Sequence, residues 1–256
     1  MIIDTHTHLF VEQFDEDRDE VIARAKAEDV EKFILPNIDA ASIPALKKTV
    51  ADYPDDMFPL MGLHPTSVKE NYGDELAIIA QELKNGKYYG IGEIGMDLYW
   101  DKTFVKEQEI IFRTQLNWAK ELRLPVSIHI REAMLETLDI IADEQDGRLR
   151  GVLHCFTGTF EEAQRAVDLN MHLGIGGVVT FKNGKIDRFL NRIPIENIVV
   201  ETDAPWLTPA PFRGKRNEPA YLKYIVEKLA LIYRTTPGEI ACLTTHNAMD
   251  VFGELV

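Results

Sequence analysis

Cysteine is scarce in this chain of 256 residues, which contains only Cys155 and Cys242. Two isolated cysteines are too few for a disulfide scaffold, and they do not form a CxxC metal or redox motif. So low a content is typical of proteins that work in a reducing compartment. We therefore expect a cytoplasmic protein.

Long apolar runs are also lacking. No segment approaches the roughly 18 consecutive apolar residues that a membrane-spanning helix requires, and the N-terminal segment shows no basic stretch followed by the apolar core of a signal peptide. We therefore expect no targeting segment and no contact with a membrane.

Positive charge is in short supply. Lysine and arginine total 28 against 42 aspartates and glutamates, and the formal net charge is -14. This balance argues against broad, nonspecific attraction to nucleic acid, but a metal site can reverse the field locally. Bulk charge therefore does not decide the substrate.

Linkers, low-complexity tracts and short-period repeats are absent as well, so no domain boundary is indicated. A chain of 256 residues that is 45% hydrophobic can bury one large core, and single α/β barrels commonly have this length. We expect one domain over residues 1–256.

Short apolar or β-branched runs alternate with helix-like stretches along the chain. The expected strands cover residues 2–4, 32–36, 57–61, 88–92, 126–130, 150–155, 171–176 and 197–201. The expected helices cover residues 19–29, 105–123, 131–143 and 160–169, and the stretch from Glu218 onward is expected to be helical and to wrap the barrel. Alternating β and α units whose strands are apolar on both faces predict a buried parallel sheet, and eight such units predict a TIM (β/α)8 barrel.

Two helix starts carry capping signals. Thr159 precedes a helix with Glu162 placed to reach back as in a capping box, and Thr236 precedes Pro237 at a first helical position. The glycines at 174, 176 and 177 match no phosphate-binding pattern, so they are interpreted as packing or turn glycines.

His6 and His8 end the first expected strand. Side chains two residues apart in an extended chain project the same way, with Cβ atoms roughly 7 Å apart. Neutral imidazole nitrogens suit Zn, Mn, Fe or Ni, so the pair predicts a metal clamp. For the pair taken alone, a polar strand end or the remnant of a tag is the alternative interpretation.

Four further candidate ligands fall at the C-terminal ends of expected strands, namely Glu93, His129, His154 and Asp203. In an α/β barrel these ends converge on one face, where active sites are built. With His6 and His8, they supply four imidazoles and two carboxylates, which is generous for one tetrahedral ion and enough for two. We therefore expect a binuclear centre.

Each expected ligand has an expected role. Glu93 would bridge the two ions, since a carboxylate has one oxygen for each. His6 and His8 would hold one ion, and His129 and His154 the other. Asp203 would serve as a ligand and would also orient or deprotonate the attacking water.

The expected chemistry follows from the charge of such a centre. Two divalent ions beside two carboxylates leave a positive site that attracts an anion. A phosphodiester fits between ions about 4 Å apart, one activating water and the other stabilising the leaving oxygen. The same Lewis acidity also serves an ester, lactone, amide or aminoacyl-tRNA, and a noncatalytic barrel with a closed coordination sphere is a third possibility.

Several cationic residues are expected near the same face. Arg131 has two interpretations, a phosphate contact or a salt bridge at a helix start. Arg213, Lys215 and Arg216 stand beside Phe212 in one loop after the last expected strand. Such a loop can grip a nucleic-acid backbone and stack a base, and a merely solvated loop is the alternative.

Other residues are expected to support the site. His64 would contact substrate phosphate or have a structural role, while Asp4 and Glu201, each two residues before an expected ligand, would orient an imidazole or water. Tyr99 and Trp100 would line the cleft or pack at its rim. His172 and His246 lie outside the ligand pattern and are interpreted as structural.

Six motifs occur in order along the chain: DTHTH at 4–8, GLHP at 62–65, GEIGMD at 92–97, HIR at 129–131, HCFTG at 154–158 and ETDAPWL at 201–207. Together they resemble the TatD family of metal-dependent hydrolases, from His6 to the segment at 247–248. The resemblance implies a TIM barrel of the amidohydrolase-like superfamily and a metal-dependent deoxyribonuclease, with 3′-to-5′ exonuclease action known in some members.

The resemblance also implies that the six residues named above are the metal ligands, with no ligand missing. Glu93 stands where related amidohydrolases often use a carboxylated lysine, so no modified lysine is needed. The expected cofactors are two divalent ions, drawn from Mg, Mn, Zn, Ni or Fe, and the expected partner is a DNA end or single-stranded region. The oligomeric state is left open.

Overall fold

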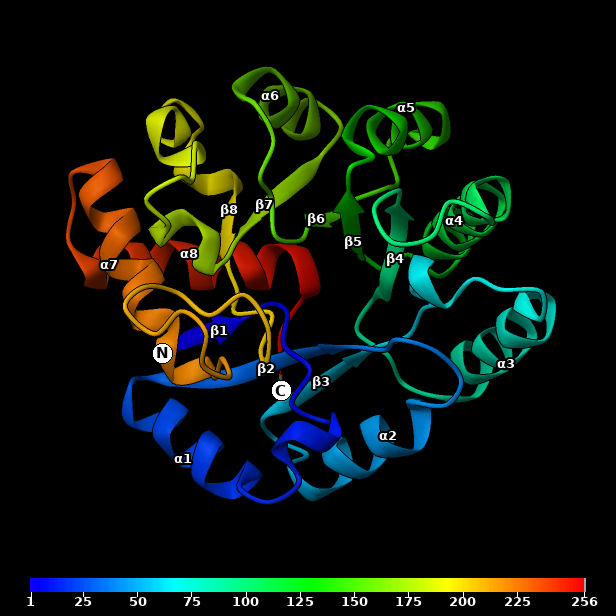
Figure 1. Ribbon diagram of the computed structural model, residues 1–256, viewed down its shortest axis with the longest axis horizontal. Helices are drawn as coiled ribbons and strands as arrows, with labels where there is room; N and C mark the ends of the chain where they lie inside the picture. Colours follow the sequence, from blue (N-terminus) through cyan, green and yellow to red (C-terminus); the bar gives the residue numbers. More distant parts are fainter. Residues whose placement is uncertain (256) are drawn as a thin grey trace.

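The computed structural model describes residues 1–255, in which strands and helices alternate (Figure 1). The strands are β1 (Ile2–Asp4), β2 (Val30–Pro36), β3 (Met57–Leu60), β4 (Ile91–Asp97), β5 (Val126–Arg131), β6 (Gly151–Leu153), β7 (Met171–Ile175) and β8 (Ile198–Val200). The helices are α1 (Arg18–Ala27), α2 (Ile43–Asp52), α3 (Tyr72–Asn85), α4 (Val105–Leu122), α5 (Met134–Glu144), α6 (Phe160–Asp168), α7 (Leu222–Tyr233) and α8 (Pro237–Phe252). The strands form a central ring with helices around it, so the predicted TIM-barrel architecture is confirmed.

All neighbouring strands in the ring run parallel. They form two sheets, one with the order β1-β2-β3 and one with the order β4-β5-β6-β7-β8. Isolated backbone hydrogen bonds join the sheet edges: Thr5 N donates to Val200 O at 3.1 Å beyond β1, and Met61 N donates to Gly90 O at 3.1 Å beyond β3. The carboxyl ends of the strands therefore face a common space.

The expected strand at 88–92 was placed too early, because β4 runs from Ile91 to Asp97. The neighbouring strand β3 contains Pro59, which accepts a bond from Tyr89 N but has no N–H to return. The regular ladder with β5 begins only at Ile91. Glu93 therefore lies inside a strand rather than after it.

The expected helix at 131–143 also begins later, at Met134. Arg131 still belongs to β5, where it pairs with Asp97. His129 lies in β5 two residues before its end, close to the C-terminal end at which it was expected. The side chain shares the face of β5 that carries Arg131 and Ser127, because alternate strand residues point the same way.

Both predicted helix caps are confirmed. Thr159 accepts a bond from Glu162 N at 3.2 Å while the Glu162 carboxylate accepts one from Thr159 N at 2.7 Å, completing a capping box at α6. Thr236 caps α8 by accepting from Glu239 N at 3.2 Å, with Pro237 as the first helical residue. Local sequence therefore defines where these two helices start.

The C-terminal segment is helical as expected, but α8 crosses the ring of strands rather than wrapping around it (Figure 1). It packs Ala248, Val251 and Phe252 against side chains of the barrel strands, namely Ile3, Ile34, Phe58, Leu60, Val152 and Val199. Asn247 in the same helix donates to the carbonyls of Ile195 and Ile198, at the start of β8. These apolar contacts fill the end of the barrel opposite the carboxyl ends of the strands.

Among residues 1–255, no helix is both long enough and apolar enough to span a membrane.

Candidate metal centre

Glu93 stands at the centre of a cluster of imidazoles. Its carboxylate, 4% exposed, projects from β4 among ring nitrogens that come from both sheets. Oε2 lies 3.2 Å from Nε2 of His6 and 3.5 Å from Nε2 of His8. Oε1 lies 3.0 Å from Nδ1 of His129, 3.3 Å from Nε2 of His64 and 3.5 Å from Nε2 of His154. The two oxygens of one carboxylate thus divide the imidazoles into two halves.

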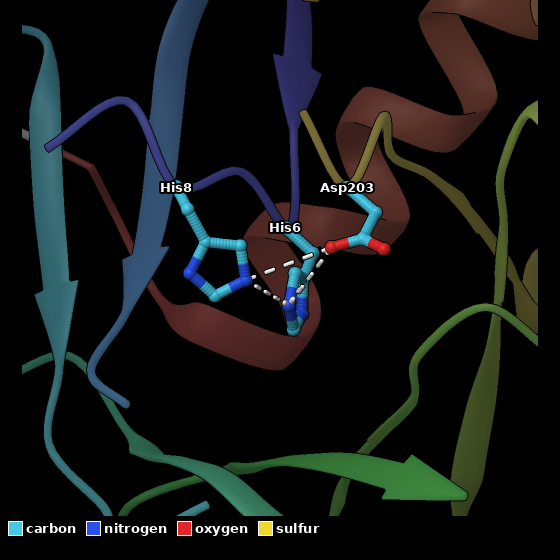
Figure 2. Close-up of side chains that lie close together, drawn as sticks. All are labelled: His6, His8 and Asp203. Carbon is cyan, nitrogen blue, oxygen red and sulfur yellow. Dashed lines mark hydrogen bonds and ion pairs between the residues drawn. The ribbon is translucent and has the colours of Figure 1, made fainter. Parts of the chain in front are cut away.

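Asp203 completes the half around Oε2. Its Oδ1 lies 3.6 Å from Nε2 of His8 and 4.0 Å from Nε2 of His6, and those two nitrogens are 3.2 Å apart. Figure 2 shows the two rings and the carboxylate turned toward one another. A backbone bond from Asp203 N to His6 O, 2.9 Å long, fixes the segment after β8 against the end of β1.

Hydrogen bonds on the far side of three rings set their orientation. His129 donates from Nε2 to Asp97 Oδ2 at 2.9 Å, and His154 donates from Nδ1 to Glu201 Oε1 at 2.9 Å. Nδ1 of His6 lies 3.0 Å from the Ser127 hydroxyl oxygen. In each ring the other nitrogen then faces Glu93, which is how proteins hold histidine ligands toward a metal.

Of the two roles expected for Asp4, orienting an imidazole or a water, the first is wrong, since within residues 1–255 its carboxylate bonds to no imidazole ring. Its carboxylate accepts from Thr202 N at 2.9 Å, from the Thr202 hydroxyl at 2.5 Å and from His6 N at 3.3 Å. Burial raises the pKa of Asp4 to about 8. Asp4 therefore joins the backbone segments that carry His6 and Asp203. Glu201, by contrast, contacts the ring of His154 directly.

The protonation of two central groups, Glu93 and His6, suits cation binding. Burial by itself would raise the pKa of Glu93, but the imidazoles of His64 and His6 hold it well below its usual range. Burial lowers the pKa of His6 well below its usual range. An ionised carboxylate beside a neutral imidazole is the state in which both serve as metal ligands. For His154, burial by itself would lower the pKa, but the carboxylates of Glu201 and Glu93 raise it to about 10, so this ring must release a proton before it serves as a ligand.

The donor set fits divalent cations. Three overlapping groups bring ligand atoms within 4.8 Å of one another: His6, His8 and Asp203; His6, Glu93 and His154; and His64, Glu93 and His129. Mixed imidazole and carboxylate donors suit Zn, Mn, Fe or Ni. All six residues expected as ligands are brought together in these groups.

His64 joins the ligand cluster although the sequence indicated only a phosphate contact or a structural role. Its Nδ1 lies 2.7 Å from the Thr66 hydroxyl and accepts from Thr66 N at 3.1 Å, capping the short 3-10 helix η2 (Pro65–Ser67). The remaining nitrogen, Nε2, points at Glu93. The half around Oε1 therefore has three imidazoles rather than two.

Asp97 and Ser127 were not identified from the sequence, although the two-residue period of a strand contains the signal. Asp97 lies four residues after Glu93 on β4, and Ser127 lies two residues before His129 on β5, so each shares a face with a ligand. Their roles depend on the pairing of the two strands, which the sequence alone does not specify.

A cleft of about 980 Å³ opens above this cluster, and Arg131, Arg213 and Lys215 are among its lining residues. Trp206 and Phe181 line it as well. These three cations were expected to contact substrate, and they lie where a substrate of the metal centre would pass. Of the two interpretations of Arg131, the salt bridge at a helix start is not found within residues 1–255; its guanidinium instead lies 3.8 Å from the ring centroid of Tyr99.

Arg216 does not belong to the cleft, although it was grouped with Arg213 and Lys215. Its guanidinium forms two bonds with the Asp17 carboxylate, 2.8 and 2.6 Å long, and donates to the Gln13 carbonyl. The charge is therefore neutralised by the segment before α1, over which the 211–219 loop folds back. Arg216 has a structural role rather than the expected substrate contact.

Comparison with known proteins places the chain among metal-dependent hydrolases. A family model described as TatD related DNase matches residues 3–253. The chain is 41% identical over 253 residues to the uncharacterized metal-dependent hydrolase YabD of Bacillus subtilis, covering 98% of this chain and 99% of that protein. It is 34% identical over 258 residues to the 3'-5' ssDNA/RNA exonuclease TatD of Salmonella typhimurium, with 98% of each chain covered.

The fold is also found among solved structures. The crystal structure of YjjV, a TatD homologue from Escherichia coli K12, superposes with a TM-score of 0.92 at 28% identity, covering 99% of this chain and 98% of that one. A TatD-family hydrolase from Entamoeba histolytica superposes with a TM-score of 0.84 at 23% identity, covering 98% and 97%.

Proposed function

Since the chain belongs to the TatD-related DNase family of metal-dependent hydrolases, we propose that it is a nuclease that removes nucleotides from the 3′ end of DNA. The observation that supports a phosphodiester substrate most directly is the division of the donors between the two oxygens of Glu93. A carboxylate with imidazoles around both oxygens is suited to bridging two cations. Such a pair offers one anionic diester two points of attachment.

We assign the ligands to two ions. Glu93, His6, His8 and Asp203 would hold one ion, and Glu93, His129 and His154 would hold the other, with His64 placed beside the second group. When bound, divalent ions lower the pKa of water and offset negative charge on phosphoryl oxygens.

Asp203 is the proposed proton acceptor for the attacking water. Burial raises the pKa of Asp203 to about 6, with the imidazole of His154 acting in the opposite direction. A carboxylate beside the reacting bond can accept a proton from the attacking water. Its side chain is 13% exposed and lines the cleft, so water has access to it.

The cations of the cleft are proposed to bind the phosphates on either side of the reacting bond. Arg131 is the last residue of β5, whereas Arg213 and Lys215 come from the loop after β8, so positive charge lies on two walls of the cleft. A relative with 34% identity is named a single-stranded DNA and RNA exonuclease, and this supports a nucleic-acid substrate for the present chain.

The location of the protein is part of the proposal. Cys155 and Cys242 are both free thiols. Free thiols are typical of a reducing compartment, which supports the cytoplasm as the site of action.

The proposal is tested with protein of defined metal content and single-stranded DNA labelled at either the 5′ or the 3′ end. Release of single nucleotides from the 3′ end is expected, with a loss of about 10²- to 10⁴-fold in kcat for Asp203→Asn. Asp143→Asn, at a carboxylate that is 64% exposed on α5, is the matched control. Turnover of carboxylic esters or aminoacyl-tRNA without any cleavage of DNA or RNA would reject a nuclease, and full activity without metal would reject the mechanism.

A further inference from the structure

Two aromatic side chains stand out of the protein at the edge of the cleft. Tyr99 is 46% exposed and Trp100 67% exposed, directly after β4. Their rings meet edge to face, with centroids 4.9 Å apart. Leaving so much apolar surface in water is unfavourable, so a preformed apolar surface beside a candidate active site marks a binding surface.

Arg131 covers part of this surface. Its guanidinium carbon lies 3.8 Å from the ring centroid of Tyr99 and 5.0 Å from that of Trp100. Within residues 1–255 no carboxylate forms an ion pair with it. A guanidinium held over a ring by this contact keeps N–H groups free to bind an anion.

The Asp97 side chain fixes the position of this aromatic surface relative to the metal centre. Oδ1 of Asp97 accepts bonds from Tyr99 N and Trp100 N, each 3.0 Å long, while Oδ2 accepts from the ring of His129 at 2.9 Å. The aromatic pair is thus fixed relative to a candidate ligand. A rigid surface needs little reorganisation on binding.

A second cation–π contact, between Arg213 and Phe181, lies on the opposite wall of the cleft. The guanidinium carbon of Arg213 is 3.8 Å from the ring centroid of Phe181, and both residues line the same cleft. One wall follows β4 and β5, and the other follows β7 and β8, with the β6 ligand His154 between them. A flexible chain laid from wall to wall therefore passes over the candidate ligands.

We propose that Trp100 stacks an unpaired nucleobase of the substrate while Arg131, held over the ring of Tyr99, binds the adjoining phosphate. This inference rests on the proposed nuclease function and identifies the side chains that would favour an unpaired base over a paired one. Bases in a duplex are stacked on one another and paired, so they cannot lie on an exposed indole without being unpaired first. A single strand presents its base faces freely, and stacking on aromatic rings tolerates any sequence.

The kinetic test compares metal-loaded wild-type protein with Trp100→Ala, Trp100→Phe and Leu231→Ala, the last removing a 77% exposed side chain on α7. The substrates are a single-stranded thymidine oligonucleotide and an abasic strand with the same number of phosphates. Loss of one stacked base is expected to raise KM by about tenfold or more for the thymidine strand. KM for the abasic strand and kcat for both should change little, Trp100→Phe should restore most of the affinity, and Leu231→Ala should behave as wild type.

A binding measurement separates this inference from the proposed function. Fluorescence anisotropy with a phosphorothioate-linked thymidine strand, alone and annealed to its complement, reports affinity whether or not the bond is cleaved. Tighter binding of the single strand by wild type, lost in Trp100→Ala, is the expected result. Equal affinities for wild type and Trp100→Ala would overturn the stacking surface even if DNA is hydrolysed. Absence of hydrolysis by wild type would overturn the nuclease, and the affinities would still decide the inference.

Discussion

Replacing Asp97 by asparagine is expected to harm metal binding more than replacing it by alanine. The carboxylate accepts three hydrogen bonds, two from the backbone N–H groups of Tyr99 and Trp100 and one from His129 Nε2. Burial would raise the pKa of Asp97, but these bonds lower it to about 2, so Asp97 is an acceptor on both oxygens throughout the working pH range.

An asparagine at position 97 has one oxygen and one NH2 group, so one of them faces the two backbone N–H groups and the other faces His129. Turning the oxygen toward the two backbone N–H groups keeps two bonds, each contributing about 1 kcal/mol, whereas the opposite orientation sets NH2 against both donors. The NH2 group therefore faces His129. Because it only donates, Nε2 must become the acceptor, and the proton moves to Nδ1, the nitrogen that faces Glu93.

The size of the effect follows from this change of tautomer. Loss of an outer partner of a histidine ligand typically costs about 10- to 100-fold in metal affinity, equivalent to about 1.4 to 2.7 kcal/mol. Asp97→Ala leaves Nε2 free to donate to water, so we expect about tenfold weaker binding. Asp97→Asn holds His129 in the wrong tautomer, so we expect metal binding to be about 100-fold weaker or more.

Metal content after dialysis against a graded chelator series, with calorimetric titration of Mn or Zn, measures the affinities directly. Nitrogen-15 correlation spectra of the imidazoles of the metal-free proteins report the tautomer of His129. Wild-type metal affinity in Asp97→Asn, or a weaker effect in Asp97→Asn than in Asp97→Ala, would refute the reasoning.

Three further predictions concern stability. Mn or Zn at a hundred times its dissociation constant should raise the free energy of unfolding by about 2.7 kcal/mol and raise Tm by about 5 to 11 °C in scanning calorimetry. Glu93→Gln should lose most of that rise in Tm. An equal rise in both proteins would contradict the ligand assignment. Glu144→Gln should lower the free energy of unfolding by about 1 to 2 kcal/mol at pH 7, because it leaves the nearly buried Lys120 ammonium without its counter-charge. The hydrogen bond from Lys120 lowers the pKa of Glu144 below its ordinary 4.5, so this contribution is complete above pH 4.5 and declines as the pH falls through the lowered value; urea unfolding at pH 7, 5 and 4 should show the difference from wild type shrinking, not growing. Thr159→Ala should cost about 1 kcal/mol in urea unfolding by removing the cap of α6, whereas Thr159→Ser, which keeps the hydroxyl, should cost much less.

The fold was predicted well where local pattern decides it. The capping threonines at 159 and 236 mark helix starts because a side-chain oxygen satisfies nearby backbone N–H groups whatever the surrounding structure. The boundaries of β4 were missed because they depend on what its neighbours supply, including the N–H that Pro59 lacks. The course of α8 was missed because its apolar face does not reveal which surface it covers.

In the candidate site too, local sequence predicts some features and tertiary contacts decide the others. Residue type and spacing indicate imidazole and carboxylate ligands, since chemical identity is a property of the sequence. The contact between His6 and Ser127 joins residues 121 positions apart, and no local pattern reports it. No local pattern reports the ion pair of Arg216 either, because its partner Asp17 lies near the other end of the chain.

The sequence by itself determined which groups are available as ligands and the alternation of strands and helices that brings strand ends to one face, because these follow from side-chain chemistry and short-range periodicity. Only the tertiary structure decided how the imidazoles divide between the two oxygens of Glu93, that His64 belongs with them, and that Asp97 links a ligand to an exposed aromatic surface. These are distances between distant segments, and they exist only once the barrel has formed.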